Sequence, residues 1–168
     1  MMILDKFLFG RSKRQTPSLT TIFTSPAAGA AMQSIEAVQA IKNRGLLGDR
    51  YFKETGHWQS IEACQVTLIS DHDLRHMQKY GKAQVGEGQH RRNLIVAGIK
   101  TQKLENKRFL IGDALFAWHK QRPPCAYIDS ITEPWMSKTL GLHAGVCLHV
   151  LESGLIQVGD PLTIVADV

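Results

Sequence analysis

The chain has 168 residues, of which 43% are hydrophobic and 21% are charged. This length and composition predict one compact domain with an apolar core, and they exclude a disordered or membrane-embedded chain. The net charge of +5 indicates an anionic partner. The basic residues are spread along the sequence without a Lys/Arg run or a helix-turn-helix pattern, so we expect a small anionic ligand and no nucleic acid.

The N-terminal segment and the cysteines indicate the cellular compartment. The uncharged run at residues 7–10 is too short for a signal-peptide core, and no segment reaches the length of a transmembrane span. Cys64, Cys125 and Cys147 form neither a CxxC pair nor an even-numbered disulfide framework. Cys64 and Cys147 lie beside or within apolar strand patterns, where we expect ordinary buried thiols. We therefore predict no membrane span and a reducing compartment, the cytoplasm.

Short apolar runs separated by turn residues dominate the chain. In chain order we expect strands at residues 19–24, 65–69, 93–97, 109–111, 114–119, 146–151, 156–158 and 162–165. Periodicity leaves residues 34–41 ambiguous between strand and helix. Turn residues predict two hairpins, one at Gly112-Asp113 and one around residues 152–154. So many short strands favour a mainly β fold, a barrel or a sandwich that carries a few helices.

Two segments carry helix signals. Ser70 has the side chain of an N-cap and is followed by acidic residues, and Gly81 is placed to end that helix. Residues 131–140 predict a second helix, interrupted or started at its internal proline. His72 and His76 lie four residues apart on the first helix but lack a third ligand, so we expect surface histidines.

Cys125 is the first candidate for chemistry. It follows a segment with two prolines, which keep the backbone out of regular structure and present a side chain. The neighbouring His119, Lys120 and Arg122 would favour the thiolate form. A thiolate is a soft ligand that suits molybdenum. The residues alone leave open an ordinary thiol without a chemical role.

Two glycine-bearing segments carry arginines suited to an anion. In GLLGDR, which ends at Arg50, the glycines allow close approach of the backbone to a ligand, and the guanidinium matches a phosphate. In GEGQHRRN, Arg91 and Arg92 stand before a strand, and Asn93 can hydrogen-bond the edge of a pterin-like ring. The alternative for both segments is a solvated loop with surface charge.

Taken in order, six segments resemble the motifs of the MOSC family, named for the C-terminal domain of molybdenum cofactor sulfurase. They are residues 45–51 (GLLGDRY), 65–69 (QVTLI), 91–98 (RRNLIVAG), 109–113 (FLIGD), 122–125 (RPPC) and 154–160 (GLIQVGD). The sequence looks most like the small stand-alone bacterial members. The resemblance implies an N-terminal extension at residues 1–17 and a MOSC domain at residues 18–168, with a MOSC-type β-barrel and peripheral helices.

The resemblance also implies a molybdenum cofactor, in which a pterin (molybdopterin) holds the metal. Cys125 would be the catalytic residue and molybdenum ligand. The residues expected around the cofactor are Arg50, Arg91, Arg92, Asn93, Arg122 and His119. The implied activity is the two-electron reduction of small N-hydroxylated compounds to the amine or amidine. Because the chain has no set of cysteines for an iron–sulfur cluster, the electrons would come from a separate protein.

Two other functions stay open at this point. In the first, Cys125 is a sulfur carrier whose persulfide serves the assembly of metal–sulfur cofactors. In the second, the domain binds the cofactor without catalysis, for storage, transfer or docking on a partner. The sequence does not determine the oligomeric state.

Overall fold

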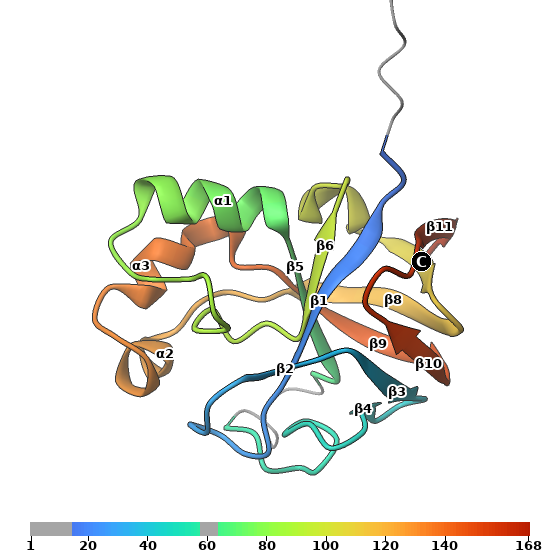
Figure 1. The fold of residues 1–168 in the computed structure, drawn as a ribbon, viewed down its shortest axis with the longest axis horizontal. Helices are drawn as coiled ribbons and strands as arrows, with labels where there is room; N and C mark the ends of the chain where they lie inside the picture. The colour runs from blue at the N-terminus through green and yellow to red at the C-terminus, as the bar shows by residue number, and fades with distance from the viewer. Residues whose placement is uncertain (1–14, 58–63) are drawn as a thin grey trace, which may run out of the picture.

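The computed structural model describes residues 15–57 and 64–168, and these residues form two sheets with helices beside them (Figure 1). The larger sheet contains, in spatial order, β11 (Leu162–Asp167), β7 (Lys107–Ile111), β8 (Ala114–Gln121), β9 (Val146–Glu152), β5 (Val66–Ser70), β6 (Leu94–Ala97), β1 (Ser18–Thr24) and β2 (Gln33–Ile35). The smaller sheet contains β10 (Gly154–Gln157), β3 (Ala37–Ile41) and β4 (Gly45–Leu46). The helices are α1 (Asp71–Tyr80), α2 (Ala126–Ile131) and α3 (Met136–Leu140), with short 3₁₀ turns η1 (Thr101–Leu104) and η2 (Gly141–His143).

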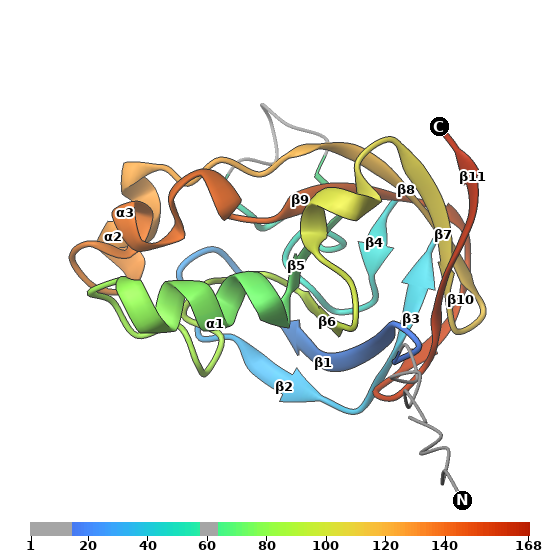
Figure 2. The ribbon, with the colours of Figure 1, turned by 90° about the horizontal axis from the view of Figure 1, so that it is seen from above.

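The larger sheet is curled into half of a barrel. Its neighbouring strands are antiparallel, except that β5 and β6 are parallel. Seen from above, the strands curve around one half of the molecule, and α1, α2 and α3 lie together in the other half (Figure 2). The prediction of a mainly β, barrel-like fold with peripheral helices is confirmed.

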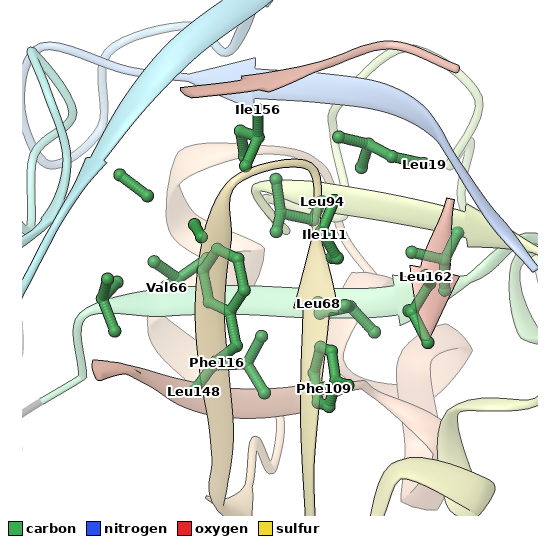
Figure 3. Close-up of a cluster of buried hydrophobic side chains, with 14 of the residues drawn as sticks. Leu19, Val66, Leu68, Leu94, Phe109, Ile111, Phe116, Leu148, Ile156 and Leu162 are labelled. Atoms are coloured by element: carbon green, nitrogen blue, oxygen red, sulfur yellow. The ribbon is translucent and has the colours of Figure 1, made fainter. Parts of the chain in front are cut away.

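Apolar side chains fill the inside of the curled sheet (Figure 3). Leu68 of β5, Leu94 of β6 and Phe116 of β8 are fully buried there. Val38 of β3 and Ile156 of β10 belong to the same cluster, so the smaller sheet packs against the apolar face of the larger one. Burial of one such side chain stabilises the fold by about 1.5–3 kcal/mol, which makes this cluster a main source of stability.

The strand β5 is buried on both faces. All five of its residues are buried. Leu68 faces the barrel core, whereas Ile69 joins a second cluster with Met77 of α1, Ile95 of β6 and Leu140 of α3. The helices therefore cover the outer face of β5 and β6. Strands covered on both faces are rich in Val, Leu and Ile, as this one is at three of its five positions, which explains why it was easily predicted.

The helix predicted between Ser70 and Gly81 is confirmed. The Ser70 hydroxyl accepts the N–H of Asp73 at 3.1 Å, as an N-cap does. The N–H of Gly81 donates to the carbonyl of Met77 at 2.7 Å and ends the helix. The φ of Gly81 is −83°, so the residue is not left-handed. Glycine is needed because a Cβ would overlap the side chain of Thr139.

The structure resolves the ambiguous residues 34–41 as parts of two strands, β2 and β3. The helix predicted at 131–140 is interrupted at Pro134, one of the two forms expected, and comprises the end of α2 and all of α3. The β7–β8 hairpin is confirmed, but the hairpin around residues 152–154 is wrong, because β10 pairs with β3. Both edges of β9 are already paired, with β5 and β8. The turn therefore directs the chain to the other sheet, where the Ser153 hydroxyl accepts the N–H of Lys42 at 2.7 Å.

The predicted division into an extension at 1–17 and a domain at 18–168 stays a prediction, because residues 1–14 lie outside the described part of the chain. Pro17, directly before β1, already contacts the sheet, because its carbonyl accepts the N–H of Leu162 at 2.8 Å. Within residues 15–57 and 64–168, no helix has both the length and the apolar character that crossing a membrane requires.

Two glycines near β10 distinguish a steric from a conformational requirement. A Cβ at Gly154 would overlap the backbone of Asp113, whereas one at Gly159 meets nothing within 4 Å, although its φ is +96°. We expect Gly154→Ala to lower the free energy of unfolding by about 3 kcal/mol. Gly159→Ala should lower it by only about 1–2 kcal/mol, the cost of a left-handed alanine. Urea denaturation measures both, and an equal loss in the two variants would contradict this assignment.

Candidate functional site

Four predicted arginines and Cys125 line one pocket. Arg50 comes from the turn after β4, and Arg91 and Arg92 come from the loop before β6. Arg122 and Cys125 come from the loop between β8 and α2. The other lining residues are Ala28, Tyr51, His57, Pro123, Pro124, Tyr127, Ile128 and Ile131. Among the described residues that line this pocket, none is acidic, so its charge is positive.

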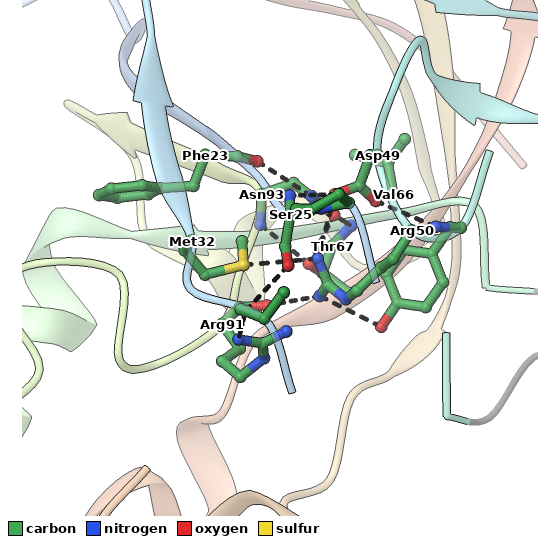
Figure 4. Close-up of polar contacts among 12 residues, drawn as sticks. Phe23, Ser25, Met32, Asp49, Arg50, Val66, Thr67, Arg91 and Asn93 are labelled. Atoms are coloured by element: carbon green, nitrogen blue, oxygen red, sulfur yellow. Dashed lines mark hydrogen bonds and ion pairs between the residues drawn. The ribbon is translucent and has the colours of Figure 1, made fainter. Parts of the chain in front are cut away.

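A buried carboxylate fixes the position of Arg50 (Figure 4). Asp49 is fully buried, and its Oδ1 accepts the N–H of Ser25 at 3.0 Å and an Nη1–H of Arg50 at 3.1 Å. Its Oδ2 accepts the N–H of Tyr51 at 3.2 Å. Nη2 of Arg50 donates to the backbone carbonyl of Arg91 at 2.9 Å. Arg50 is only 4% exposed, so the alternative of a solvated arginine is wrong.

The glycines of this segment serve the fold. Gly45 and Gly48 have φ values of +117° and +85°, which glycine adopts at little cost. A Cβ at Gly45 would overlap the backbone carbonyl of Gln65. The close approach at Gly45 is therefore to another segment of the chain, whereas a Cβ at Gly48 would meet nothing within 4 Å.

Arg91 has an unsatisfied donor at the pocket. Its Nη1 donates to the carbonyl of Ala30 at 2.6 Å, but its buried Nη2 has no hydrogen-bond partner among the described residues. Burial lowers the pKa of Arg91 to about 10, helped by the positive charge of Arg50, so the guanidinium stays protonated at neutral pH. Arg91 also has a left-handed backbone, with φ of +60°. A buried charged donor without a partner is costly, which makes this Nη2 a candidate position for the acceptor atom of a ligand.

Arg92 is fixed by backbone carbonyls and by His90. Nε of Arg92 donates to the carbonyl of Ala144, and its Nη1 donates to the carbonyl of His90 at 3.1 Å. The N–H of Arg92 donates to Nδ1 of His90 at 2.9 Å, which requires a neutral ring. Burial lowers the pKa of Arg92 to about 10 and that of His90 to about 3. Arg91 and Arg92 are 7% and 4% exposed, so the alternative of a solvated loop is wrong for this pair.

Cys125 lies between a rigid loop and a helix. It is half-buried and occupies the N-cap position of α2 with an extended backbone, φ −136° and ψ 164°. Its carbonyl accepts the N–H of Ile128 at 3.1 Å. At the start of the loop, the N–H of Arg122 donates to the carbonyl of Gly145 at 2.9 Å, and its Nη2 donates to the Tyr51 hydroxyl at 3.3 Å. The loop is thus held at both ends, with the cysteine presented to the pocket.

Two predicted residues are not among those that line the pocket. Oδ1 of Asn93 accepts the N–H and the hydroxyl of Thr67, each at 3.0 Å, and its Nδ2 donates to the carbonyl of Phe23 at 3.0 Å (Figure 4). His119 lies at a register shift in β8, and its ring stacks on His149 at 4.1 Å. A direct cofactor contact by Asn93 or His119 stays a prediction. In the structure, the Asn93 side chain links the start of β6 to β5 and β1.

Three aromatic residues of the pocket were not singled out from the sequence. The Tyr51 hydroxyl accepts from Arg50 at 3.5 Å and from Arg122 at 3.3 Å, and burial raises the pKa of Tyr51. The rings of His57 and Tyr127 stack with centroids 3.6 Å apart and planes within 8° of parallel. Tyr51 ends the segment GLLGDRY and could have been chosen with it. No motif marks His57 or Tyr127, which only the folded chain brings together.

The histidines of α1 are on the surface, as predicted. His72 and His76 are exposed. Nδ1 of His72 lies 3.5 Å from a carboxylate oxygen of Asp73, and the ring of His76 packs against Tyr80. In the portion of the chain that the structure describes, no group of three or more potential metal ligands among His, Cys, Asp and Glu occurs.

The fold and the pocket define a small β domain that combines buried arginines with a half-buried cysteine. The MOSC domain family matches residues 46–163, and the chain belongs to this family. The MOSC domain is associated with binding of the molybdenum cofactor. None of the curated protein sequences compared with the chain matches it significantly.

Solved structures share the fold at low sequence identity. The YuaD protein from Bacillus subtilis is 14% identical, with a TM-score of 0.72 over 88% of this chain and 94% of that chain. YiiM from Geobacillus stearothermophilus is 16% identical, with a TM-score of 0.64 over 89% of this chain and 75% of that chain. YiiM from Escherichia coli is 14% identical, with a TM-score of 0.62 over 89% and 70%. The resemblance inferred from the six motifs is thus confirmed for family and fold.

The neutral His90 ring predicts a pH dependence of stability. In the unfolded chain His90 titrates near 6.5, whereas in the folded chain its pKa is about 3. The unfolded state therefore binds more protons between these values, and the contribution of His90, complete above pH 6.5, is lost as the pH falls toward 3. We expect His90→Asn, which keeps an acceptor for the N–H of Arg92, to reduce this loss by up to about 1.4 kcal/mol per pH unit.

Urea denaturation between pH 8 and pH 4 measures the effect. The control is His72→Asn, because His72 is exposed and should leave the pH dependence as in the wild type. An unchanged slope in His90→Asn would show that another group is responsible.

Proposed function

We propose that this chain binds a molybdenum–pterin cofactor in the four-arginine pocket and that Cys125 ligates the molybdenum. One observation carries the proposal: the buried Nη2 of Arg91 has no partner among the described residues, in a pocket that Cys125 also lines. A phosphate on the cofactor would accept this donor. The family association with the molybdenum cofactor supports the same ligand.

The charges of the pocket fit an anionic cofactor. Arg91 and Arg92 keep their protons at neutral pH because their pKa values are about 10. Buried positive charges without a nearby anion are costly, and a bound phosphate would compensate them with short, bidentate hydrogen bonds. The hydrogen bonds of Asp49 go to Arg50, Ser25 and Tyr51, so its carboxylate compensates Arg91 only through its charge.

Each pocket residue then has a definite task. Arg91 and Arg92 bind the phosphate end of the cofactor, and Tyr51 holds Arg50 and Arg122 in position through its hydroxyl. Cys125 supplies a soft thiolate ligand from a loop that two prolines stiffen. The stacked rings of His57 and Tyr127 form an aromatic part of the pocket wall.

When bound, the metal supplies the two-electron reduction of an N–O bond, and the protein supplies binding and orientation. The substrates of the proposed activity are small N-hydroxylated compounds, and a separate electron-donor protein in the cytoplasm provides the electrons. Partial exposure of Cys125 is compatible with a small substrate that approaches from solvent.

A second candidate function is sulfur transfer through a persulfide on Cys125. The same partial exposure favours it, because a persulfide has to reach an acceptor. The basic surroundings would also stabilise the anion of a persulfide. The two functions use one residue and differ in whether metal is present.

Cys125→Ser tests the metal-ligand role. Wild-type protein and the variant are purified gently from a host that makes the cofactor, and molybdenum and pterin are quantified in both. We expect near-stoichiometric metal in the wild type, and loss of metal and of N-hydroxylated-compound reduction in the variant. The exposed Ser130→Ala, on α2, is the matched control and should behave as the wild type.

The other outcomes separate the alternatives. Full activity in Cys125→Ser would refute the ligand role. A wild-type protein that carries a Cys125 persulfide and no molybdenum supports sulfur transfer. Stoichiometric cofactor without reductase activity, given a competent electron donor, supports storage or transfer of the cofactor.

Arg91→Gln tests the anion site without the metal. Loss of a charged donor should weaken binding of inorganic phosphate about tenfold, as measured by isothermal titration calorimetry at low ionic strength. Arg75→Gln on α1 is the control, because Arg75 is exposed and does not line the pocket; it forms an ion pair with Asp71 at 2.9 Å. Equal affinity in Arg91→Gln and the wild type would contradict the assignment of the phosphate to Arg91.

A further inference from the structure

Two cysteines that the sequence pattern marks as ordinary thiols lie in contact. Sγ of Cys64 and Sγ of Cys147 are 2.9 Å apart, although 83 positions separate them in the chain. Both side chains are buried, with exposures of 2% and 0%. They form a small cluster with Tyr51, on the side of β9 away from the barrel core.

We infer that Cys64 and Cys147 are a redox-sensitive pair that forms a reversible disulfide. The inference is independent of the proposed function, because it uses neither Cys125 nor a metal. The position of the pair is what connects it to the pocket: Tyr51 belongs to the same buried cluster as both cysteines, and the Tyr51 hydroxyl accepts from Arg50 and Arg122 of the pocket. The pair therefore lies one side chain away from the candidate site.

The sheet holds the two cysteines differently. Cys147 lies in β9, where it pairs with Thr67 of β5, and its neighbour Leu148 pairs with Val66. Cys64 lies two residues before β5 begins, so its backbone is not held in the strand ladder. The sulfurs have to approach by roughly 1 Å to reach the bonding distance of about 2.05 Å. A movement of this size at Cys64, which lies outside β5, would not require a change in the β5–β9 register.

The surroundings make the two thiols unequal. The S–H of Cys64 donates to Cys147, which lowers the pKa of Cys147, and Arg122, Arg92 and Lys120 lower it further against the effect of burial. The same hydrogen bond, together with burial, raises the pKa of Cys64. Cys147 is therefore the nucleophile, and Cys64 is the resolving thiol.

The oxidant has to be small, because both sulfurs are buried; we specify hydrogen peroxide. The Cys147 thiolate attacks one peroxide oxygen, the O–O bond breaks, and the hydroxide that leaves takes up a proton to become water. Cys64 then loses its proton and attacks the sulfenic sulfur of Cys147, which forms the S–S bond and releases a second water. Two thiols lose two electrons, and one peroxide is reduced to two waters.

Peptide mapping of the full chain tests the inference. Wild-type, Cys125→Ser and Cys147→Ser proteins are treated with one equivalent of hydrogen peroxide, alkylated, digested without reductant and analysed by mass spectrometry. In the wild type and in Cys125→Ser we expect a peptide pair that links Cys64 with Cys147. Its mass should be two hydrogen atoms below the sum of the two reduced peptides, and dithiothreitol should cleave it. It should be absent from Cys147→Ser. In Cys125→Ser, oxidation should also raise the Tm by roughly 5 °C, because the bond closes a long loop.

Other results would overturn the inference. If Cys64 and Cys147 stay fully alkylatable after denaturation while Cys125 is oxidised, the pair is not redox-sensitive. A disulfide that joins Cys125 to either of them would also refute it. The wild-type map gives this answer directly, so it does not depend on whether Cys147→Ser folds. Absence of molybdenum from the purified protein has no bearing on the result, which keeps the two proposals separable.

Discussion

The hydrogen bonds of the Asn93 side chain hold the centre of the sheet, and the placement of the pocket arginines depends on them. Its amide binds β5 through Thr67 and β1 through Phe23, at the residue before β6 begins. Arg91 and Arg92 directly precede it, so the backbone passes from this joint into the pocket without an intervening linker. Because β5 and β6 are parallel, a tight turn cannot connect them, and α1 with the following loop makes the crossing. The amide network sets where this long connection rejoins the sheet.

The pocket is costly to the fold that contains it. Its guanidiniums are withdrawn from water and repel one another, as the lowered pKa values of Arg91 and Arg92 record. Backbone carbonyls of Ala30, His90 and Ala144 satisfy part of this demand, and Asp49 neutralises Arg50. Nη2 of Arg91 keeps no partner among the described residues. An anion that binds this donor only in the folded chain would stabilise the fold. Unsatisfied buried groups of this kind concentrate at functional sites.

Local signals in the sequence predicted local structure well. The caps of α1 and the apolar run of β5 act within a few residues, and the arginine and cysteine motifs indicated the residues that meet in the pocket. Strand pairing between segments far apart in the sequence was harder to predict. The turn after β9 was evident, but the partner of β10 depends on which strand edges are already occupied. The burial of Arg91 and Arg92 follows from packing around them, and the contact between Cys64 and Cys147 follows from the β5–β9 register. No pattern within one segment encodes these relations.

The pairing of β3 with β10 has a consequence for biosynthesis. Val38 and Ala40 of β3 leave the ribosome early, but Ile156, which packs in the same cluster, follows only after most of the chain has been translated. Until then one face of the growing core has no cover, and its apolar side chains are accessible to chaperones or to other nascent chains. Segments joined across so long a sequence separation form their contacts slowly, because loop closure precedes the gain from burial. The core is therefore completed late, after translation of β10 and β11, which supply Ile156 and Leu162.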